Sequence, residues 1–393
     1  MVEDAQPAES DSPAGDAGSR TPMVVWAGTW LPWSQTFIYE QLQSEQRFES
    51  TVFCHRYAGN HAELFPHPRV KTLPPWEWPA YLTARVSPTY TRTLRELKPA
   101  ILHAHFGFHG QHAAGFAKRE RLPLAVSFHG KDGAALTWDA RKRIDFVAYR
   151  NWMAPAMFRT AQRFLPVSED QADILMSAGV GIDRIHVHDL GIPLDRFELY
   201  ERPDGPLRIL MVGRMVEKKG MEYGVRAMAR IRTEFPDARM KIIGSGFLEK
   251  RLRRIAFELE IEDVVEFLGV VPPDRVAAEM KAANVVLCPS VVSHWGDREG
   301  GLTVCKEASA TGLPVVATAH GGIPRVVDHG RTGILVPERQ VTPIVNALRE
   351  LGRSKKLRDE LGLEGRKKVE REFDGRTQSE RLEAHFQDVI DCF

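Results

Sequence analysis

The chain has 393 residues, 43% of them hydrophobic and 27% charged, which suits a globular protein with more than one domain. Its 53 basic and 52 acidic side chains leave a formal net charge of +1, so the charge balance does not indicate nucleic acid as a partner. The cysteines show neither paired nor metal-like spacing, which argues against a disulfide scaffold and favours reduced thiols in a cytoplasmic protein.

Residues 1–22 are rich in Ala, Ser, Pro, Gly and acidic side chains, and we expect a disordered acidic tail there. The segment has neither the basic start nor the apolar centre of a signal peptide. No apolar run in the chain is long enough to span a bilayer. The sequence therefore predicts a cytoplasmic location.

The region 23–197 predicts an N-terminal α/β domain. Apolar runs bounded by turn residues predict buried strands at 23–28, 100–106, 123–130, 164–168 and 185–191. After the first strand, Ser34 is expected to cap a helix that begins with Gln35 and its neighbours. A simple helix cap and a substrate-facing loop explain these two residues equally well.

A histidine follows the expected strand at 123–130. His129 lies beside Gly130, with Asp132 shortly after it. A lone histidine in a sequence is more often structural than functional. His129 is nevertheless interpreted as functional, because ligands bind at the carboxyl ends of strands in open α/β sheets.

Two segments of this domain, 74–95 and 141–163, combine aromatic and basic side chains. Such a composition suits an anionic membrane surface. Ordinary helices that turn their aromatic rings inward would give the same pattern. Because there are two such segments, we expect a peripheral contact with the inner face of a membrane.

After a linker at 198–206, the region 207–373 alternates between strands and helices. Strands are expected near 207–213, 240–244, 265–270, 284–289, 313–317 and 333–336. This alternation predicts a parallel sheet with helices on both faces. The last segment, 374–393, has the apolar spacing of an amphipathic helix.

Cations and glycines follow the first two strands of this second domain. Arg214 and Lys219 come after the strand at 207–213, and Gly244 and Gly246 come after the next strand. The carboxyl ends of parallel strands meet at one edge of a sheet. We therefore expect these residues to lie together where such sheets bind ligands.

A stretch between the fourth and fifth strands of this domain combines glutamates, glycines and the start of a helix expected at 302–311. Its candidate ligand-binding residues are Glu299, Gly300, Gly301, Leu302, Thr303 and Glu307. The glycines leave room for a ligand at the backbone, and the helix start offers free N–H groups to an anion. Glu307 falls among apolar residues, where its carboxylate needs donors such as ligand hydroxyls. Two water-facing glutamates would explain this stretch alone equally well.

Cations suited to a diphosphate and carboxylates suited to sugar hydroxyls together describe a nucleotide-sugar site. The chain contains no Asp-x-Asp sequence, the usual carboxylate cradle for a metal-chelated diphosphate. We therefore expect Arg214 and Lys219 to hold the diphosphate without a metal ion or any other cofactor.

These motifs resemble those of the retaining glycosyltransferases of family 4, also called glycosyl transferases group 1. The resemblance rests on Gly213-Arg214 with Lys219-Gly220, on Gly244-Ser245-Gly246, on Glu299 and Glu307 eight positions apart, and on Gly321-Gly322-Ile323-Pro324. It covers essentially all of the C-terminal half in order, whereas the N-terminal half matches more loosely. There, the run from Ser34 to Ile38 replaces the common Gly-Gly loop and resembles a variant of some exopolysaccharide and colanic-acid-type members.

The resemblance implies the GT-B architecture, in which two Rossmann-like domains face each other across a cleft. The donor would bind the C-terminal domain and the acceptor the N-terminal one, and the last helix would cross back to the first domain. The activity would be transfer of a sugar, with retained anomeric configuration, from a nucleotide sugar to a hydroxyl of a saccharide or lipid-linked acceptor. Such a reaction belongs to the synthesis of polysaccharides, glycolipids or other glycoconjugates.

The resemblance also implies individual roles. Arg214 and Lys219 would stabilise the departing diphosphate, assisted by Thr303 and the amides of Gly301 and Leu302. Glu299 would hold hydroxyls of the transferred sugar, Glu307 would hold those of the ribose, and His129 would meet the sugar from the other domain. The residues expected on the acceptor side are Ser34, Gln35 and Asp132.

Three other functions share part of this pattern, and none of these residues specifies the sugar, the base, the acceptor or the oligomeric state. A nicotinamide-dependent enzyme could use Gly244 and Gly246, but position 249 is glutamate instead of the third glycine of the dinucleotide fingerprint. A GT-B-type phosphorylase would need a second anion site. A non-catalytic sugar-nucleotide-binding protein would have no need of His129 together with both glutamates.

Overall fold

The computed structural model describes residues 20–57, 65–67, 69–137 and 143–393. Most of the expected tail at 1–22 lies outside these residues. The first strand already begins at Thr21.

The N-terminal domain is built on a parallel six-stranded sheet with the order β5-β3-β1-β6-β7-β8. Its strands are β1 (Thr21–Trp26), β3 (Phe48–Cys54), β5 (Val70–Thr72), β6 (Ile101–His105), β7 (Leu124–Phe128) and β8 (Arg163–Pro166), and a separate short pair joins β2 (Thr29–Trp30) to β4 (Arg56–Tyr57). Its helices are α1 (Thr36–Gln43), α2 (Trp78–Ala84), α3 (Pro88–Leu97), α4 (Gly107–Glu120), α5 (Lys131–Ala134), α6 (Ile144–Ala148), α7 (Ala154–Thr160) and α8 (Glu169–Ser177).

Alternation of side chains along β1 shows why this sheet is covered on both faces. Val24 and Trp26 belong to one buried cluster, with rings from α2 and α3, whereas Met23 and Val25 belong to a second cluster on the other face. Helices on both faces are what a parallel sheet requires. Within the described part of the chain, no helix is long and apolar enough to cross a membrane.

One expected strand of this domain is wrong. The segment 185–191 does not form a strand, and only Ile185 makes an isolated bridge to β8. The amides of His186 and His188 bond to the edge of β8, at 2.9 Å each, before the chain leaves the sheet and crosses to the other domain. The brief pairing with β8 explains why this segment has the apolar pattern of a strand. The pairing ends where the chain crosses to the other domain.

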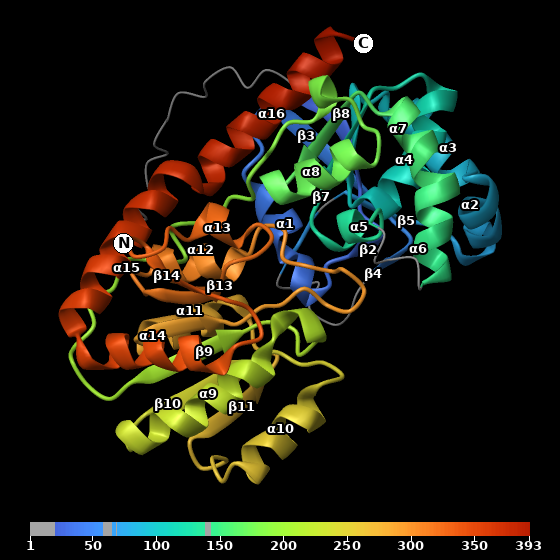
Figure 1. Cartoon of the computed structure of the whole chain (residues 1–393). Coiled ribbons are helices and arrows are strands. Elements are labelled where there is room, and N and C mark those ends of the chain that lie inside the picture. Colours follow the sequence, from blue (N-terminus) through green and yellow to red (C-terminus); the bar gives the residue numbers. More distant parts are fainter. Residues whose placement is uncertain (1–19, 58–64, 68, 138–142) are drawn as a thin grey trace, which may run out of the picture.

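The C-terminal domain has a second parallel six-stranded sheet, with the order β11-β10-β9-β12-β13-β14 (Figure 1). Its strands are β9 (Arg208–Val212), β10 (Arg239–Ile243), β11 (Val265–Gly269), β12 (Val285–Cys288), β13 (Val315–Thr318) and β14 (Gly333–Val336). Its helices are α9 (Met221–Glu234), α10 (Glu249–Glu258), α11 (Pro273–Ala282), α12 (Thr303–Ala310), α13 (Ile323–Val326), α14 (Val341–Arg353) and α15 (Lys355–Glu372). The α/β class with two parallel sheets is therefore confirmed.

The last helix, α16 (Gly375–Asp391), packs against the N-terminal domain, as its red ribbon shows in Figure 1. Its buried Glu383 accepts hydrogen bonds from the amides of Gln46, Arg47 and Phe48, at 2.7, 2.9 and 3.4 Å. One turn further on, Phe386 packs edge-on against the ring of Phe48. A buried carboxylate that is satisfied by three amides fixes the end of the chain to the start of β3.

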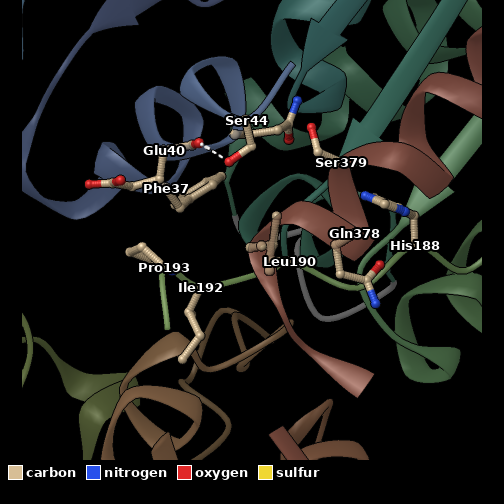
Figure 2. A pocket seen from close by; sticks show the side chains of 12 residues that line it. Phe37, Glu40, Ser44, His188, Leu190, Ile192, Pro193, Gln378 and Ser379 are labelled. Atoms are coloured by element: carbon tan, nitrogen blue, oxygen red, sulfur yellow. Dashed lines mark hydrogen bonds between the residues drawn. The ribbon is translucent and has the colours of Figure 1, made fainter. Parts of the chain in front are cut away.

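The chain crosses between the domains twice, and the two crossings lie side by side. Ile192 pairs with Asp374, and the amide of Gly375 donates to the Ile192 carbonyl at 3.0 Å. A small cavity of about 30 Å³ lies between these crossings and α1, lined by side chains of α1, the first crossing and α16 (Figure 2). Gln41 Nε2 and Ser379 Oγ line it without a partner among the described residues. We call the two crossing segments, with the cavity between them and α1, the hinge.

Gly191 has no room for a side chain between the crossings, because a Cβ there would lie 2.6 Å from Gly375 Cα. We predict that Gly191→Ala separates the two segments and lowers the free energy of unfolding by about 1–3 kcal/mol. Gly205→Ala is the matched control, since a Cβ at Gly205 meets nothing within 4 Å. Urea unfolding followed by circular dichroism would measure both. Equal midpoints for the two variants would contradict the close packing of the hinge.

Candidate functional site

The candidate site lies at the carboxyl edge of the C-terminal sheet. There β9 has β10 on one side and β12 on the other. The connections after β9 and β12 therefore run in opposite directions, and we call the region between them, the usual ligand site of such sheets, the crevice. The first connection carries Arg214 and Lys219, and the second carries Glu299.

Glu299 and Lys219 form a buried ion pair between these two connections. Lys219 Nζ lies 2.9 Å from Glu299 Oε1, and Ser290 Oγ donates to the same oxygen at 3.1 Å. Burial alone would raise the pKa of Glu299, but the charges of Lys219 and Lys218 and these hydrogen bonds lower it to about 2. Glu299 is therefore ionised at neutral pH. Its Oε2 has no protein partner among the described residues, so it can accept a ligand hydroxyl.

The cations of the first connection differ in their partners. Lys218 is buried and bonded to Asp297 at 3.1 Å, which holds the second connection against the first. Lys219 runs along Gly213, where a Cβ would lie 3.1 Å from its Cε. Arg214 is exposed, and within the described residues its guanidinium group makes no hydrogen bond or ion pair. Of the two predicted cations, Arg214 is thus free for an anion, and Lys219 is held in place by Glu299.

Glu307 lies on α12, with Lys219 and Arg196 near enough for their charges to affect it. Burial raises the pKa of this carboxyl to about 7, and the neighbouring Glu40 adds to the shift while the two cations oppose it. The side chain is partly exposed, and its carboxylate has no hydrogen-bond donor in the part of the chain that the structure describes. A partly exposed carboxylate without donors is suited to ligand hydroxyls.

The start of α12 offers backbone donors. The helix begins at Thr303 with Leu302 as N-cap, and no side chain caps it. Among the described residues, the amides of Gly301 and Leu302 have no acceptor. These N–H groups at the positive end of a helix can bind an anion that enters the crevice.

The predicted glycines make room for the protein's own backbone in this conformation. A Cβ at Gly244 would lie 2.0 Å from Gly213 O, and one at Gly246 would lie 2.4 Å from Met215 O. A Cβ at Gly300 would lie 2.4 Å from His129 O, across the domain boundary. The sequence predicted that the Gly300–Gly301 step leaves room for a ligand. In this conformation the backbone of the N-terminal domain fills the space beside Gly300. Backbone also fills the space beside Gly244, which argues against the alternative function of a nicotinamide-dependent enzyme that binds its dinucleotide there.

His129 follows β7 and lies at this domain boundary. Its ring packs between those of Phe37 and Phe106, with centroids 4.9 and 4.6 Å away. His129 Nε2 lies 3.1 Å from His105 Nδ1. Burial lowers the pKa of His129 to about 3, with His103 and His188 adding to the effect, so the ring is neutral.

Asp132 is completely buried and supports the loop that carries His129. Its carboxylate accepts from the amides of His129, Gly130 and Gly107, at 3.1, 3.0 and 2.9 Å. Burial raises its pKa to about 6, although the amides act in the opposite direction. The carboxylate of Asp132 is thus bonded to backbone amides and is not exposed to solvent.

Ser34 and Gln35 lie in a single 3₁₀ turn, Trp33–Gln35, that precedes α1. The expected role of Ser34 as N-cap is wrong, because Gln35 occupies that position and no side chain makes a capping bond. Ser34 is exposed, and among the described residues neither Ser34 nor Gln35 forms a hydrogen bond or ion pair with Arg214, Lys219, Glu299 or Glu307.

Sequence reasoning missed several residues that shape this site. Ser290 lies two residues after the end of β12 and could have been found as a polar residue at a strand's carboxyl end. Arg298 bonds to Asp170 of α8 at 3.0 Å and joins the two domains beside Glu299. Nothing in the sequence spacing of Arg298 and Asp170 predicts this ion pair. Among the described residues, no group of His, Cys, Asp or Glu is arranged to hold a metal ion.

Two family models match consecutive parts of the chain. Residues 38–196 match Glycosyltransferase Family 4, and residues 195–368 match Glycosyl transferases group 1. WcaL of Escherichia coli, a colanic acid biosynthesis glycosyltransferase by name, is 33% identical over 73% of this chain and 70% of its own length. WcaL of Salmonella typhimurium is 33% identical over 64% of this chain, and the match spans 61% of that relative.

Solved structures with low sequence identity share the fold. Anabaena HepE, determined in complex with UDP-glucose, superposes with a TM-score of 0.78 at 18% identity, covering 94% of this chain and 100% of that one. Sucrose-phosphate synthase from Thermosynechococcus elongatus gives a TM-score of 0.76 at 20% identity, covering 95% and 100%. With both halves matched by family models and a relative similar over most of its length, this chain belongs to the group 1 glycosyltransferases of family 4 and is a transferase enzyme.

Proposed function

We propose that this glycosyltransferase moves a sugar from a nucleotide-sugar donor to an acceptor hydroxyl and retains the anomeric configuration, in polysaccharide or glycolipid biosynthesis. The observation that carries the proposal is the arrangement of Arg214, the Lys219–Glu299 pair and Glu307 around one crevice. The HepE structure contains UDP-glucose, and the WcaL relatives are named for exopolysaccharide synthesis, which supports the same class of donor and product.

In this mechanism the two cations act on the leaving group. Arg214 and Lys219 stabilise the negative charge that develops on the departing diphosphate, an effect typically worth about 3–4 kcal/mol per donor. The amides of Gly301 and Leu302 add donors at the start of α12. Glu299 accepts from hydroxyls of the transferred sugar, and Glu307 accepts from the ribose hydroxyls.

No carboxylate of the site is assigned as a covalent nucleophile. One oxygen of Glu299 is taken by Lys219 and Ser290 and the other is assigned to sugar hydroxyls, and Glu307 is assigned to the ribose. We therefore infer a front-face reaction in which an oxygen of the leaving diphosphate takes the proton from the acceptor hydroxyl. This route retains the configuration without a covalent intermediate.

The proposal is tested by incubating the protein with a panel of UDP-, GDP-, dTDP- and ADP-sugars and measuring hydrolysis and transfer. We expect turnover of at least one donor, with the configuration of the product, read by proton NMR, the same as that of the donor. Arg214→Ala should lower kcat/KM by about 100-fold, the loss typical for one electrostatic donor. Arg226→Ala, which removes an exposed arginine of α9 in the same domain, is the control and should leave it unchanged. An inverted product would refute the mechanism.

We also propose that the reaction requires no metal ion, because Arg214 and Lys219 supply the positive charge. The active donor of the panel would be assayed with EDTA and without added metal, and activity should persist. Complete loss that Mg²⁺ or Mn²⁺ restores would show that these cations alone do not hold the diphosphate.

The pKa of Glu307 predicts how donor binding depends on pH. At pH 6 the free protein carries this carboxyl mainly protonated, since its pKa is about 7, and a protonated carboxyl is a weaker acceptor for ribose hydroxyls. Affinity should therefore rise as the pH increases through 7, by about tenfold between pH 6 and pH 8. Calorimetry with UDP-glucose and GDP-mannose would measure it. Glu307→Gln should bind more weakly and independently of pH; an unchanged pH dependence in this variant would assign the titration to another group.

We further propose a peripheral membrane contact on the N-terminal domain. Trp76 is 80% exposed just before α2, and Trp152 is 71% exposed just after α6. Both segments pack on α4, through Tyr81 against His112 and Tyr149 against Phe108. The basic side chains in the two segments include Arg85, Arg143 and Arg150. Other aromatics of these segments, Tyr81, Tyr90, Phe146 and Phe158, are buried, so the surface is narrower than the sequence predicted.

This surface predicts binding to vesicles. Trp76→Ala combined with Trp152→Ala should weaken binding to vesicles of phosphatidylglycerol and phosphatidylcholine by roughly tenfold, about 1.4 kcal/mol. Phe257→Ala is the control, because Phe257 is 69% exposed on α10 of the other domain. Co-sedimentation would measure binding. If the control loses as much affinity as the double variant, the surface is not the one proposed.

A further inference from the structure

A pair of histidines links the core of the N-terminal domain to the domain boundary. His105 ends β6 and is completely buried, and His129 follows the neighbouring strand β7. His105 Nδ1 and His129 Nε2 are 3.1 Å apart, and their rings stack with an angle of 22° between the planes. The backbone carbonyl of His129 lies against Gly300, beside Glu299 of the donor crevice. The pair thus joins a fully buried ring to a ring next to the proposed site.

Neutral rings restrict where the protons of this pair can be. Burial keeps both imidazoles neutral, since it lowers the pKa of His129 to about 3 and that of His105 well below its usual range. Each ring therefore carries one proton. One ring must donate and the other accept in the hydrogen bond between them. The second proton then lies on an outer nitrogen, either His129 Nδ1 or His105 Nε2.

The surroundings of the two outer nitrogens decide between these arrangements. Both atoms are buried, and neither has a hydrogen-bond partner among the described residues. A buried N–H without an acceptor is rarer and more costly than an acceptor without a donor. His105 Nε2 lies deep in the domain, so the arrangement that leaves this nitrogen without a proton, as an acceptor without a donor, costs less free energy. His129 Nδ1 belongs to a partly exposed residue at the domain boundary, where a ligand can supply an acceptor.

We infer that His105 is a positioning residue: it donates from Nδ1 to His129 Nε2 and so keeps the proton of His129 on Nδ1. His129 then presents a hydrogen-bond donor to an oxygen of the bound nucleotide sugar. This inference rests on the proposed function for its ligand, but the proton positions do not depend on it. Nδ1 is covered in the present arrangement, so a ligand can reach it only when the two domains move apart to admit the donor.

The inference gives His129 a defined task. With its proton fixed on Nδ1, the ring cannot take a proton from the acceptor at that atom, so it acts as a donor to oxygen and not as the general base. His103 makes a different bond, because its Nε2 lies 2.8 Å from Ser127 Oγ. His103 is on the same strand and is equally buried, which makes it a matched control for His105.

The direct test is the tautomer of His129, read from long-range proton–nitrogen correlation spectra of the protein with ¹⁵N-labelled histidine. We expect the proton on Nδ1 in the wild type. His105→Leu should move it to Nε2 and lower kcat by about 10- to 100-fold, the range typical when the hydrogen-bond partner of a metal-ligating imidazole is removed. Affinity for UDP or GDP alone should stay unchanged. His105→Asn, whose amide nitrogen lies near the position of Nδ1, should keep the wild-type tautomer and most of the activity.

The outcomes separate this inference from a structural role and from the proposed function. His103→Leu should leave the tautomer of His129 unchanged. A proton on Nε2 in the wild type, an unchanged tautomer in His105→Leu, or an equal loss of kcat in His103→Leu would each overturn the inference. Even if His105→Leu fails to fold, the wild-type spectrum decides. If no nucleotide sugar is turned over, the proposed function fails, whereas the spectra still report the proton positions.

Discussion

The buried ion pair between Lys219 and Glu299 is the interaction on which the candidate site depends. It connects the segment after β9 to the segment after β12, and Lys218 with Asp297 makes a second link between the same segments. Removing one member of a buried pair leaves an uncompensated charge and typically costs about 3–5 kcal/mol. The pair therefore fixes the crevice geometry and at the same time places a cation and a free carboxylate oxygen at its edge.

The second constraint is the contact between the domains beside this pair. Gly300 lies directly against the carbonyl of His129, and Arg298 bonds to Asp170 of the N-terminal domain. On the far side of α12, the buried Lys306 donates to the carbonyl of Leu190 at 2.8 Å, in the first crossing segment. The helix with the proposed ribose-binding glutamate is thus attached to the hinge. A movement of one domain relative to the other would therefore shift Glu307, and domain closure around a substrate typically excludes water from the reaction.

The sequence predicted the C-terminal domain more completely than the N-terminal one. Runs such as Val285–Cys288 and Val315–Thr318 are short, apolar and bounded by turn residues, so their position and type could be read directly. The strand β3 (Phe48–Cys54) mixes polar and apolar residues and was missed, although it pairs with β1 along its length. The segment 185–191 looked like a strand because it pairs briefly with β8 before it crosses to the other domain.

For the site, residue type and strand position were enough to bring Lys219 and Glu299 into one crevice. The role of the glycines could not be predicted from the sequence, because it depends on contacts with the backbone of distant segments, such as that of Gly213 with Gly244. The same holds for the bond between His105 and His129, which requires the register of two adjacent strands.

The central claim is that the crevice between the segments after β9 and β12 binds the nucleotide of the donor. Crystal structures of the protein soaked with UDP and with GDP test it most directly. The account predicts the diphosphate at Arg214 and Lys219 and the ribose hydroxyls at Glu307. A second cavity, of about 400 Å³, is lined by Met215 and Met221 after β9, by Phe247 after β10 and by Val291 and His294 after β12. A nucleotide bound in that cavity, with Glu307 empty of ligand, would contradict the account.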